Sequence, residues 1–132
     1  MVMVDSVVWI AYKNRRDTWH EKAKVLLPKI LEQKKSIFIT DYIILEVVNF
    51  LLRKINYKTS VETLDMFLST DRIKLLHNDA ISFLATKNVM EKYQGLSFTD
   101  ANIIVNMKEN NLKELCTLDK GFEIVKGIEI IN

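Results

Sequence analysis

Short runs of apolar residues alternate along this chain with longer amphipathic segments, and this alternation constrains the fold more than any other feature. Strand-like runs occupy residues 2–4, 37–39, 72–76, 115–118 and 128–131. Between them lie segments with helical spacing or helix-capping residues, at 7–11, 18–33, 40–52, 59–68, 78–93 and 97–107. Because helices of about ten or more residues separate the strands, we expect an α/β domain whose mainly parallel sheet is sandwiched between helices.

Some of the strand-like runs are unbroken rather than alternating, as in strands that helices cover on both faces. The run of Ile37, Phe38 and Ile39 is an example. Pro28 falls inside the helical pattern of residues 18–33, and we expect a kink or a break there. The 132 residues contain no internal repeat, low-complexity tract or linker, so we expect a single domain over residues 1–132.

Composition narrows the class of protein further. With 48% hydrophobic residues, three glycines and one proline, the chain is neither disordered nor collagen-like. The single cysteine, Cys116, excludes an internal disulfide, and we expect it to be a buried apolar side chain. The first residues lack the basic segment of a signal peptide, and no apolar run could span a bilayer. We therefore expect a cytoplasmic protein, whose net charge of +2 neither requires nor excludes a polyanionic partner.

Four acidic residues occur where solvated charges are not expected: Asp5, Glu46, Asp100 and Asp119. Asp5 and Asp119 each follow a strand, at the edge where open parallel sheets bind ligands. Asp100 begins a helix and Glu46 lies about two turns into another, so all four can reach that edge. Two charges ~4 Å apart repel by about 4 kcal/mol at an effective dielectric of about 20. Oxygen ligands without histidine or cysteine favour Mg²⁺ or Mn²⁺ as the counter-charge.

Each of these acids also has an ordinary structural interpretation. Asp5 can cap the helix that follows it, and Asp119 can form a turn. Ser97 and Asp100 have the spacing of a capping box, although Asp100 shares a stripe with core-facing residues. Glu46 lies in a helix that is apolar nearly all round. We therefore expect Glu46 to be buried, either paired with an arginine or lysine or bound to a metal.

At these residues the sequence resembles the PIN-domain ribonucleases, in particular the small VapC-type toxins of toxin–antitoxin pairs. The resemblance covers nearly the whole chain and rests on the order and spacing of four segments, VDSVVWIAY, TDYIILEVVNFL, LSFTDANII and TLDKGF. Two residues depart from the family pattern, because Val105 and Asn106 stand where many relatives have alanine. The catalytic and metal-binding residues that the resemblance implies are Asp5, Glu46, Asp100 and Asp119, with Ser6 and Thr117 as supporting hydroxyls.

The resemblance implies a Mg²⁺- or Mn²⁺-dependent endoribonuclease that hydrolyses RNA phosphodiester bonds and leaves a 5′-phosphate and a 3′-hydroxyl. Asp5 and Asp100 would be the primary metal ligands. Glu46 would be a ligand or would orient the attacking water, and Asp119 would complete a second metal position or act through a water. A homodimer and a cognate antitoxin are implied as partners. The alternatives are a PIN-fold RNA-processing nuclease and a non-catalytic module that binds RNA or protein.

Basic residues that follow the first helix are candidates for contact with RNA. Arg15 and Arg16 lie close to Tyr12 and Trp19 in the sequence, and arginine and aromatic side chains stack on bases. Lys120, beside Asp119, is a further candidate, whereas most other basic residues are expected to be solvated surface charges.

Three features favour a homodimer: the apolar helices around residues 43–52, the aromatic residues Phe67 and Phe83, and the family resemblance. We therefore expect a homodimer with helical contacts.

Two other families that gather acids at strand ends fit the sequence less well. A receiver-like phosphoacceptor domain would show paired acids near the first strand, and a haloacid-dehalogenase-like phosphatase would show Asp-x-Asp there. The segment Asp5-Ser6-Val7 has neither pattern.

Overall fold

Five parallel strands form the centre of the computed structural model, which describes all 132 residues. They are β1 (Val2–Val4), β2 (Ile37–Thr40), β3 (Ile73–Leu76), β4 (Glu114–Cys116) and β5 (Glu129–Ile131). Their order across the sheet is β3-β2-β1-β4-β5, and every neighbouring pair is parallel. The α/β class with a parallel sheet, predicted from the sequence, is confirmed.

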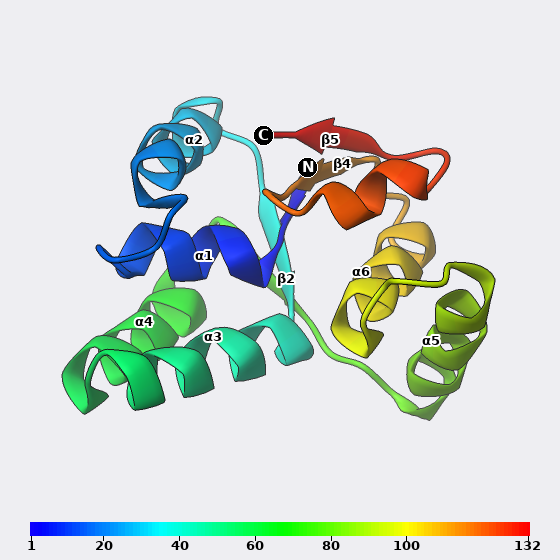
Figure 1. The fold of residues 1–132 in the computed structure, drawn as a ribbon, viewed down its shortest axis with the longest axis horizontal. Helices are drawn as coiled ribbons and strands as arrows, with labels where there is room; N and C mark the ends of the chain where they lie inside the picture. Colours follow the sequence, from blue (N-terminus) through cyan, green and yellow to red (C-terminus); the bar gives the residue numbers. More distant parts are fainter.

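Helices cover both faces of this sheet (Figure 1). One side carries α1 (Ser6–Lys13), α2 (His20–Glu32), α3 (Asp41–Lys54) and α4 (Tyr57–Ser69). The other side carries α5 (Ala80–Lys92), α6 (Phe98–Glu109) and the short 3₁₀ helix η1 (Lys120–Ile124). No helix combines the length and the apolar character that a membrane crossing requires.

The strand order reverses in the middle of the sheet. From β1 the chain moves outward to β2 and β3, and it then crosses back to β4 on the other side of β1. Val4 and Cys116 are paired at the ends of β1 and β4, so the residues that follow these two strands meet at one edge. Such a reversal point is where open α/β sheets bind their ligands.

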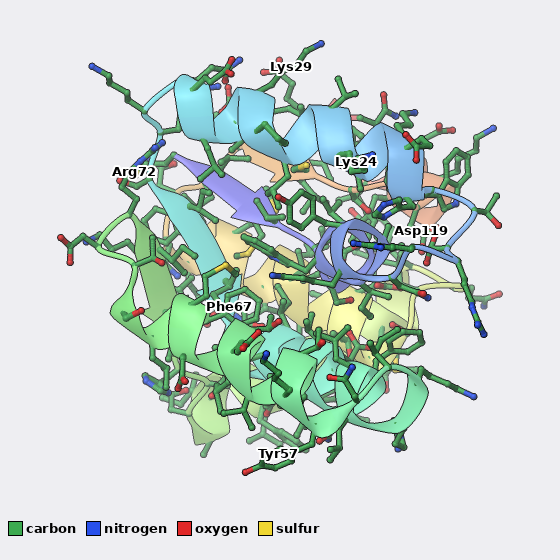
Figure 2. All side chains as sticks on the ribbon, turned by 90° about the vertical axis from the view of Figure 1, so that its left-hand side faces the viewer. Lys24, Lys29, Tyr57, Phe67, Arg72 and Asp119 are labelled. Atoms are coloured by element: carbon green, nitrogen blue, oxygen red, sulfur yellow. The ribbon has the colours of Figure 1, made fainter.

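The core lies between the sheet and the helices, and 28 of the 38 buried residues are hydrophobic. Trp9 of α1 and Phe67 of α4 meet edge to face, with ring centroids 5.0 Å apart. Figure 2 labels Phe67 where α4 lies against the sheet. With 2% of its surface exposed, Phe67 is a core residue, so it gives no support to the expected homodimer. Cys116 is buried, as expected, and this burial raises the pKa of its thiol to about 12.

Helix α2 runs through Pro28 without interruption, so of the kink or break expected there the break does not occur. The proline removes one backbone donor, but the apolar face of α2 anchors the helix on both sides of it, through Leu26, Leu27 and Ile30. Elsewhere the predicted segments differ from the observed ones by a few residues. The turn expected at residues 119–121 is the start of η1.

A network of buried amides ties α6 to the rest of the fold. Asn102 donates hydrogen bonds to Asn78 (2.7 Å) and Thr86 (2.9 Å), and Asn106 donates to Asn78 (3.0 Å). Asn78 in turn donates to Asp41 at the start of α3. The network gives Asn106, one of the two departures from the family pattern, a structural role in holding α6.

Candidate active site

Asp5 is the most deeply buried of the four acids singled out in the sequence, with 2% of its surface exposed. It precedes α1, but its side chain makes no capping hydrogen bond. Instead, Oδ2 of Asp5 accepts a hydrogen bond from the Thr117 hydroxyl (2.7 Å), and Oδ1 accepts a longer one from the Ser6 hydroxyl (3.3 Å). The helix-cap interpretation of this side chain is therefore wrong. Asp5 instead links the ends of β1 and β4.

The surroundings of Asp5 oppose its negative charge. Burial raises the pKa of Asp5 from its usual 3.8 to about 7, and the charges of Asp100 and Glu46 add to that rise. The hydrogen bond from Thr117 acts in the opposite direction and lowers the pKa. No lysine, arginine or histidine forms an ion pair with any of the four acids.

Glu46 is exposed, which corrects the expectation that it lies on a buried helix. Helix α3 buries only the stripe formed by Ile43, Val47 and Leu51, and leaves the side that carries Glu46 open. The expected ion pair with an arginine or lysine is also absent. Oε2 of Glu46 instead accepts a hydrogen bond of 2.9 Å from Ser6, whose hydroxyl lies between Glu46 and Asp5.

Asp100 has two sets of neighbours at once. It forms the capping box with Ser97, through two reciprocal hydrogen bonds of 3.1 Å, so this structural interpretation is correct. Asp100 is also half-buried, and burial raises the pKa of its carboxyl, while the Ser97 bonds lower it and the charge of Asp119 raises it. The capping bond uses Oδ2 and leaves Oδ1 without a hydrogen-bond partner.

Asp119 is exposed and caps η1 through a hydrogen bond of 2.8 Å from the backbone N–H of Gly121. The turn interpretation of Asp119 therefore holds. Its own backbone N–H donates to the Thr117 hydroxyl (3.0 Å), which in turn donates to Asp5. Thr117 thus connects the two acids that follow β1 and β4.

Together the four acids form a chain of neighbours rather than a closed cage. No three acid, histidine or cysteine side chains lie close enough, as they are placed in the structure, to hold a metal ion. Nevertheless the donors are all carboxylate and hydroxyl oxygens, without a basic partner. That donor chemistry fits a hard divalent cation such as Mg²⁺ or Mn²⁺.

A cleft of about 760 Å³ lies at the end of α1 opposite Asp5. We call it the basic cleft, because four of its eight lining residues are cationic and none is acidic: Lys13, Arg15, Arg16 and Lys54, with Asn14, Phe50, Ile55 and Thr59. Both arginines singled out in the sequence therefore line one cleft. Lys120 is exposed at the start of η1, next to Asp119.

The basic cleft and the acids share one face of α3. Glu46, Phe50 and Lys54 are spaced by four residues, so they form a stripe that runs from the acids to the cleft. Tyr12 lines a neighbouring hollow with Lys13 and Arg15. The sequence did not indicate this stripe, because the helical pattern alone does not show which face of α3 is open.

These features define a class of α/β domain with an acidic site at the reversal point of a parallel sheet. The profile of the PIN domain family matches residues 2–128, and the chain belongs to that family. The resemblance found in the sequence is thereby confirmed.

Solved structures share this fold at low sequence identity. The VapC20 toxin of Mycobacterium tuberculosis, described as cleaving the sarcin-ricin loop, is 20% identical, with a TM-score of 0.83 over 98% of both chains. A toxin–antitoxin complex from Klebsiella pneumoniae is 18% identical, with a TM-score of 0.71 over 100% of this chain and 97% of the other. VapBC2 of Rickettsia felis, bound to promoter DNA, is 15% identical, with a TM-score of 0.69 over 100% and 98%. A search of curated protein sequences finds no match.

Proposed function

We propose that this protein is a metal-dependent endoribonuclease and the toxin of a toxin–antitoxin pair. The observation that carries the proposal is the buried Asp5 carboxylate, held by Ser6 and Thr117 and surrounded by further acids without a basic partner. A carboxylate in such a place requires a counter-charge to ionise. Membership of the PIN family and the likeness to structures described as toxins support the same activity.

In this proposal Asp5 and Asp100 are the primary ligands of Mg²⁺ or Mn²⁺. A bound ion of this kind polarises the scissile phosphate and lowers the pKa of the attacking water. Thr117 fixes the Asp5 carboxylate, and Oδ1 of Asp100 is free to turn toward the ion. Glu46, exposed beside Ser6, would bind the ion or orient the water, and Asp119 would complete a second metal position or act through a water.

RNA approaches the acids along the stripe of α3 that begins in the basic cleft. Arg15 and Arg16, with Lys13 and Lys54, hold backbone phosphates, since the cleft contains no acid that would repel them. Lys120 contacts the strand on the other side of Asp119. This arrangement supports a single-stranded RNA substrate that crosses from α1 to η1.

The proposal includes two protein partners and a cellular compartment. A cognate antitoxin would hold the enzyme inactive, and one of the similar structures is described as a toxin–antitoxin complex. We also propose that the protein forms a homodimer. Action on cellular RNA places the protein in the cytoplasm.

The test is to incubate purified protein with a mixed RNA pool in Mg²⁺, in Mn²⁺ or with chelator. We expect cleavage with either metal, products with 5′-phosphates, and no cleavage with chelator. Asp5→Asn should reduce the rate about 100-fold or more, because the transition state loses a charge that positions the ion. The matched control is Asp71→Asn, an exposed acid in the α4–β3 loop, which should cleave at the wild-type rate.

Two outcomes would favour the alternatives. RNA binding without cleavage at any metal concentration would indicate a non-catalytic module. Cleavage without growth arrest, when the protein is expressed without its neighbouring reading frame, would indicate an RNA-processing nuclease rather than a toxin.

A further inference from the structure

A second concave site lies away from the acids. It has a volume of about 470 Å³ and is walled by the C-terminal ends of α5 and α6 and by the segment between η1 and β5. Lys113 and Gly127 in its wall precede β4 and β5, whereas Asp5 and Asp119 follow β1 and β4. Because all the strands are parallel, this cavity and the acids lie at opposite edges of the sheet.

The chemistry of the cavity is divided between its floor and its rim. Seven of its 14 lining residues are hydrophobic, among them Val89, Ile104 and Met107. The lining includes no acid but has four lysines, and we call the cavity the lysine-rimmed pocket: Lys92, Lys108, Lys113 and Lys126. All four lysines are exposed, and none of them forms an ion pair.

One lysine of the rim and one glycine of the wall have a distinctive local geometry. The Lys92 ammonium lies over the Tyr93 ring, 5.2 Å from its centroid, which holds this charge at the rim. Gly127 has a φ of +86°, a conformation that side chains disfavour, and turns the chain into β5. A Cβ at Gly127 would meet nothing within 4 Å, so the space beside the turn is empty.

Four unpaired positive charges around an apolar hollow are complementary to a ligand that carries both carboxylates and an apolar group. An aliphatic side chain would fit the floor, since pockets of about 300–1,000 Å³ accommodate small ligands or side-chain anchors. A nucleotide base fits less well, because half of the lining is hydrophobic and only Asn88, Tyr93 and Asn111, apart from the lysines, could hydrogen-bond its polar edge. The rim also has no arginine, the residue that best recognises phosphate by a two-pronged contact.

We propose that the lysine-rimmed pocket docks an acidic segment of a partner protein, with one aliphatic side chain on the floor and flanking aspartates or glutamates facing the lysines. The pocket is separate from the acids at the other edge of the sheet, so this docking is independent of the proposed nuclease activity.

The test is a titration of ¹⁵N-labelled protein, followed by NMR in the presence of chelator. The main probe is an acetylated octapeptide with a central leucine flanked by aspartate and glutamate. In two control peptides, lysine replaces the acids or serine replaces the leucine, and a 5′-phosphorylated hexaribonucleotide tests RNA. We expect only the first peptide to saturate, with shifts confined to residues 88–93, 104–113 and 125–128.

The variants separate a built pocket from general charge attraction. The double variant Lys92→Glu and Lys126→Glu should bind the peptide at least about tenfold more weakly, because it reverses two rim charges. The control, Lys24→Glu with Lys29→Glu, makes the same charge change on the outer side of α2 and should bind like the wild type (Figure 2).

Three results would overturn the proposal: no saturable shift, equal loss of affinity in the two double variants, or tighter binding of the hexaribonucleotide at the same residues. Since the readout is binding rather than RNA cleavage, failure here leaves the proposed nuclease function to its own test.

Discussion

Asp5 makes the metal-free protein sensitive to pH. Its pKa is about 7 in the folded chain and 3.8 as an unperturbed side chain, so between these values the folded state binds the proton more tightly. Stability from this group is therefore present at low pH and is lost as the pH rises toward 7. The loss amounts to at most about 4 kcal/mol, since one pKa unit corresponds to about 1.4 kcal/mol.

We predict that ionisation of Asp5 lowers the melting temperature of the wild type as the pH rises from about 4.5 to about 7.5, when the melt is measured with chelator. Asp5→Asn should remove that part of the slope, because an amide carries no charge to desolvate. Asp71→Asn, an exposed acid, should keep the wild-type slope. An unchanged slope in Asp5→Asn would show that Asp5 ionises normally in the folded chain.

Asp100 caps α6 and, in the proposed site, also binds the metal, and two substitutions can separate these roles. Ser97→Ala removes the capping partner and should cost about 1 kcal/mol, while leaving the response to Mg²⁺ intact. Asp100→Asn should lose most of the stabilisation that Mg²⁺ gives the wild type. At 100 times the dissociation constant this stabilisation is ~2.7 kcal/mol, or several degrees in a thermal melt. A lower melting temperature with an unchanged Mg²⁺ response would leave Asp100 as a cap alone.

Among the secondary-structure elements, α6 depends most on buried polar contacts. Asn102 is fully buried, and its amide donates to both Asn78 and Thr86. We predict that Asn102→Ala lowers the free energy of unfolding by about 1–3 kcal/mol, because it leaves the acceptor of Asn78 partly unsatisfied in the interior. Urea denaturation would measure the change. The exposed Asn88, on α5, is the control, and Asn88→Ala should stay within about 0.5 kcal/mol of the wild type.

Local signals in the sequence predicted most of the elements. The helical segments expected to begin at residues 40, 78 and 97 do begin close to those positions, where Thr40, Asp79 and Ser97 each accept a capping hydrogen bond. Unbroken apolar runs predicted the central strands β1 and β2, since a strand covered on both faces needs no polar side. Such signals lie within a few residues of the element that they define.

Features that depend on residues far apart in the sequence could not be predicted from such local signals. Periodicity showed that α3 is apolar but not which side its neighbours cover, so Glu46 was wrongly expected to be buried. The contact between Asn78 and Asn102 joins residues 24 positions apart and has no local pattern. The hydrogen bond between Thr117 and Asp5 spans 112 positions, and only the family resemblance pointed to Thr117 as a support.

At the scale of the whole molecule, the sheet order explains why the acids could be grouped from sequence. Asp5 and Asp119 follow β1 and β4, which are neighbours on either side of the strand-order reversal. Any parallel sheet with this order brings such residues together, whatever the details of packing. The basic cleft, by contrast, depends on how the ends of α1 and α3 pack, and only single residues of it were recognised.

The surface of the molecule also has an apolar region that no other part of the chain covers. The ring of Phe98 lies 6.1 Å from the ring of Tyr42 and 5.2 Å from the ring of Phe83. These three contacting rings connect the starts of α3, α5 and α6. Leu45 follows Tyr42 along α3 and Leu84 follows Phe83 along α5. These leucines are 59% and 66% exposed, and Phe83 is 51% exposed. We call these five residues the aromatic patch. Exposed apolar patches of this kind mark protein–protein contacts.

We predict that the aromatic patch is the homodimer interface. Ultracentrifugation at micromolar concentration should give about twice the chain mass of 15.4 kDa. Phe83→Ser with Leu84→Ser should give a monomer, because a stable interface needs about 800 Å² from each partner and these side chains supply much of its apolar centre. The control is Leu68→Ser on α4, which removes an apolar side chain of 63% exposure outside the patch and should leave the dimer intact. A wild-type mass near 15.4 kDa would refute the homodimer, and dissociation by Leu68→Ser alone would move the interface to α4.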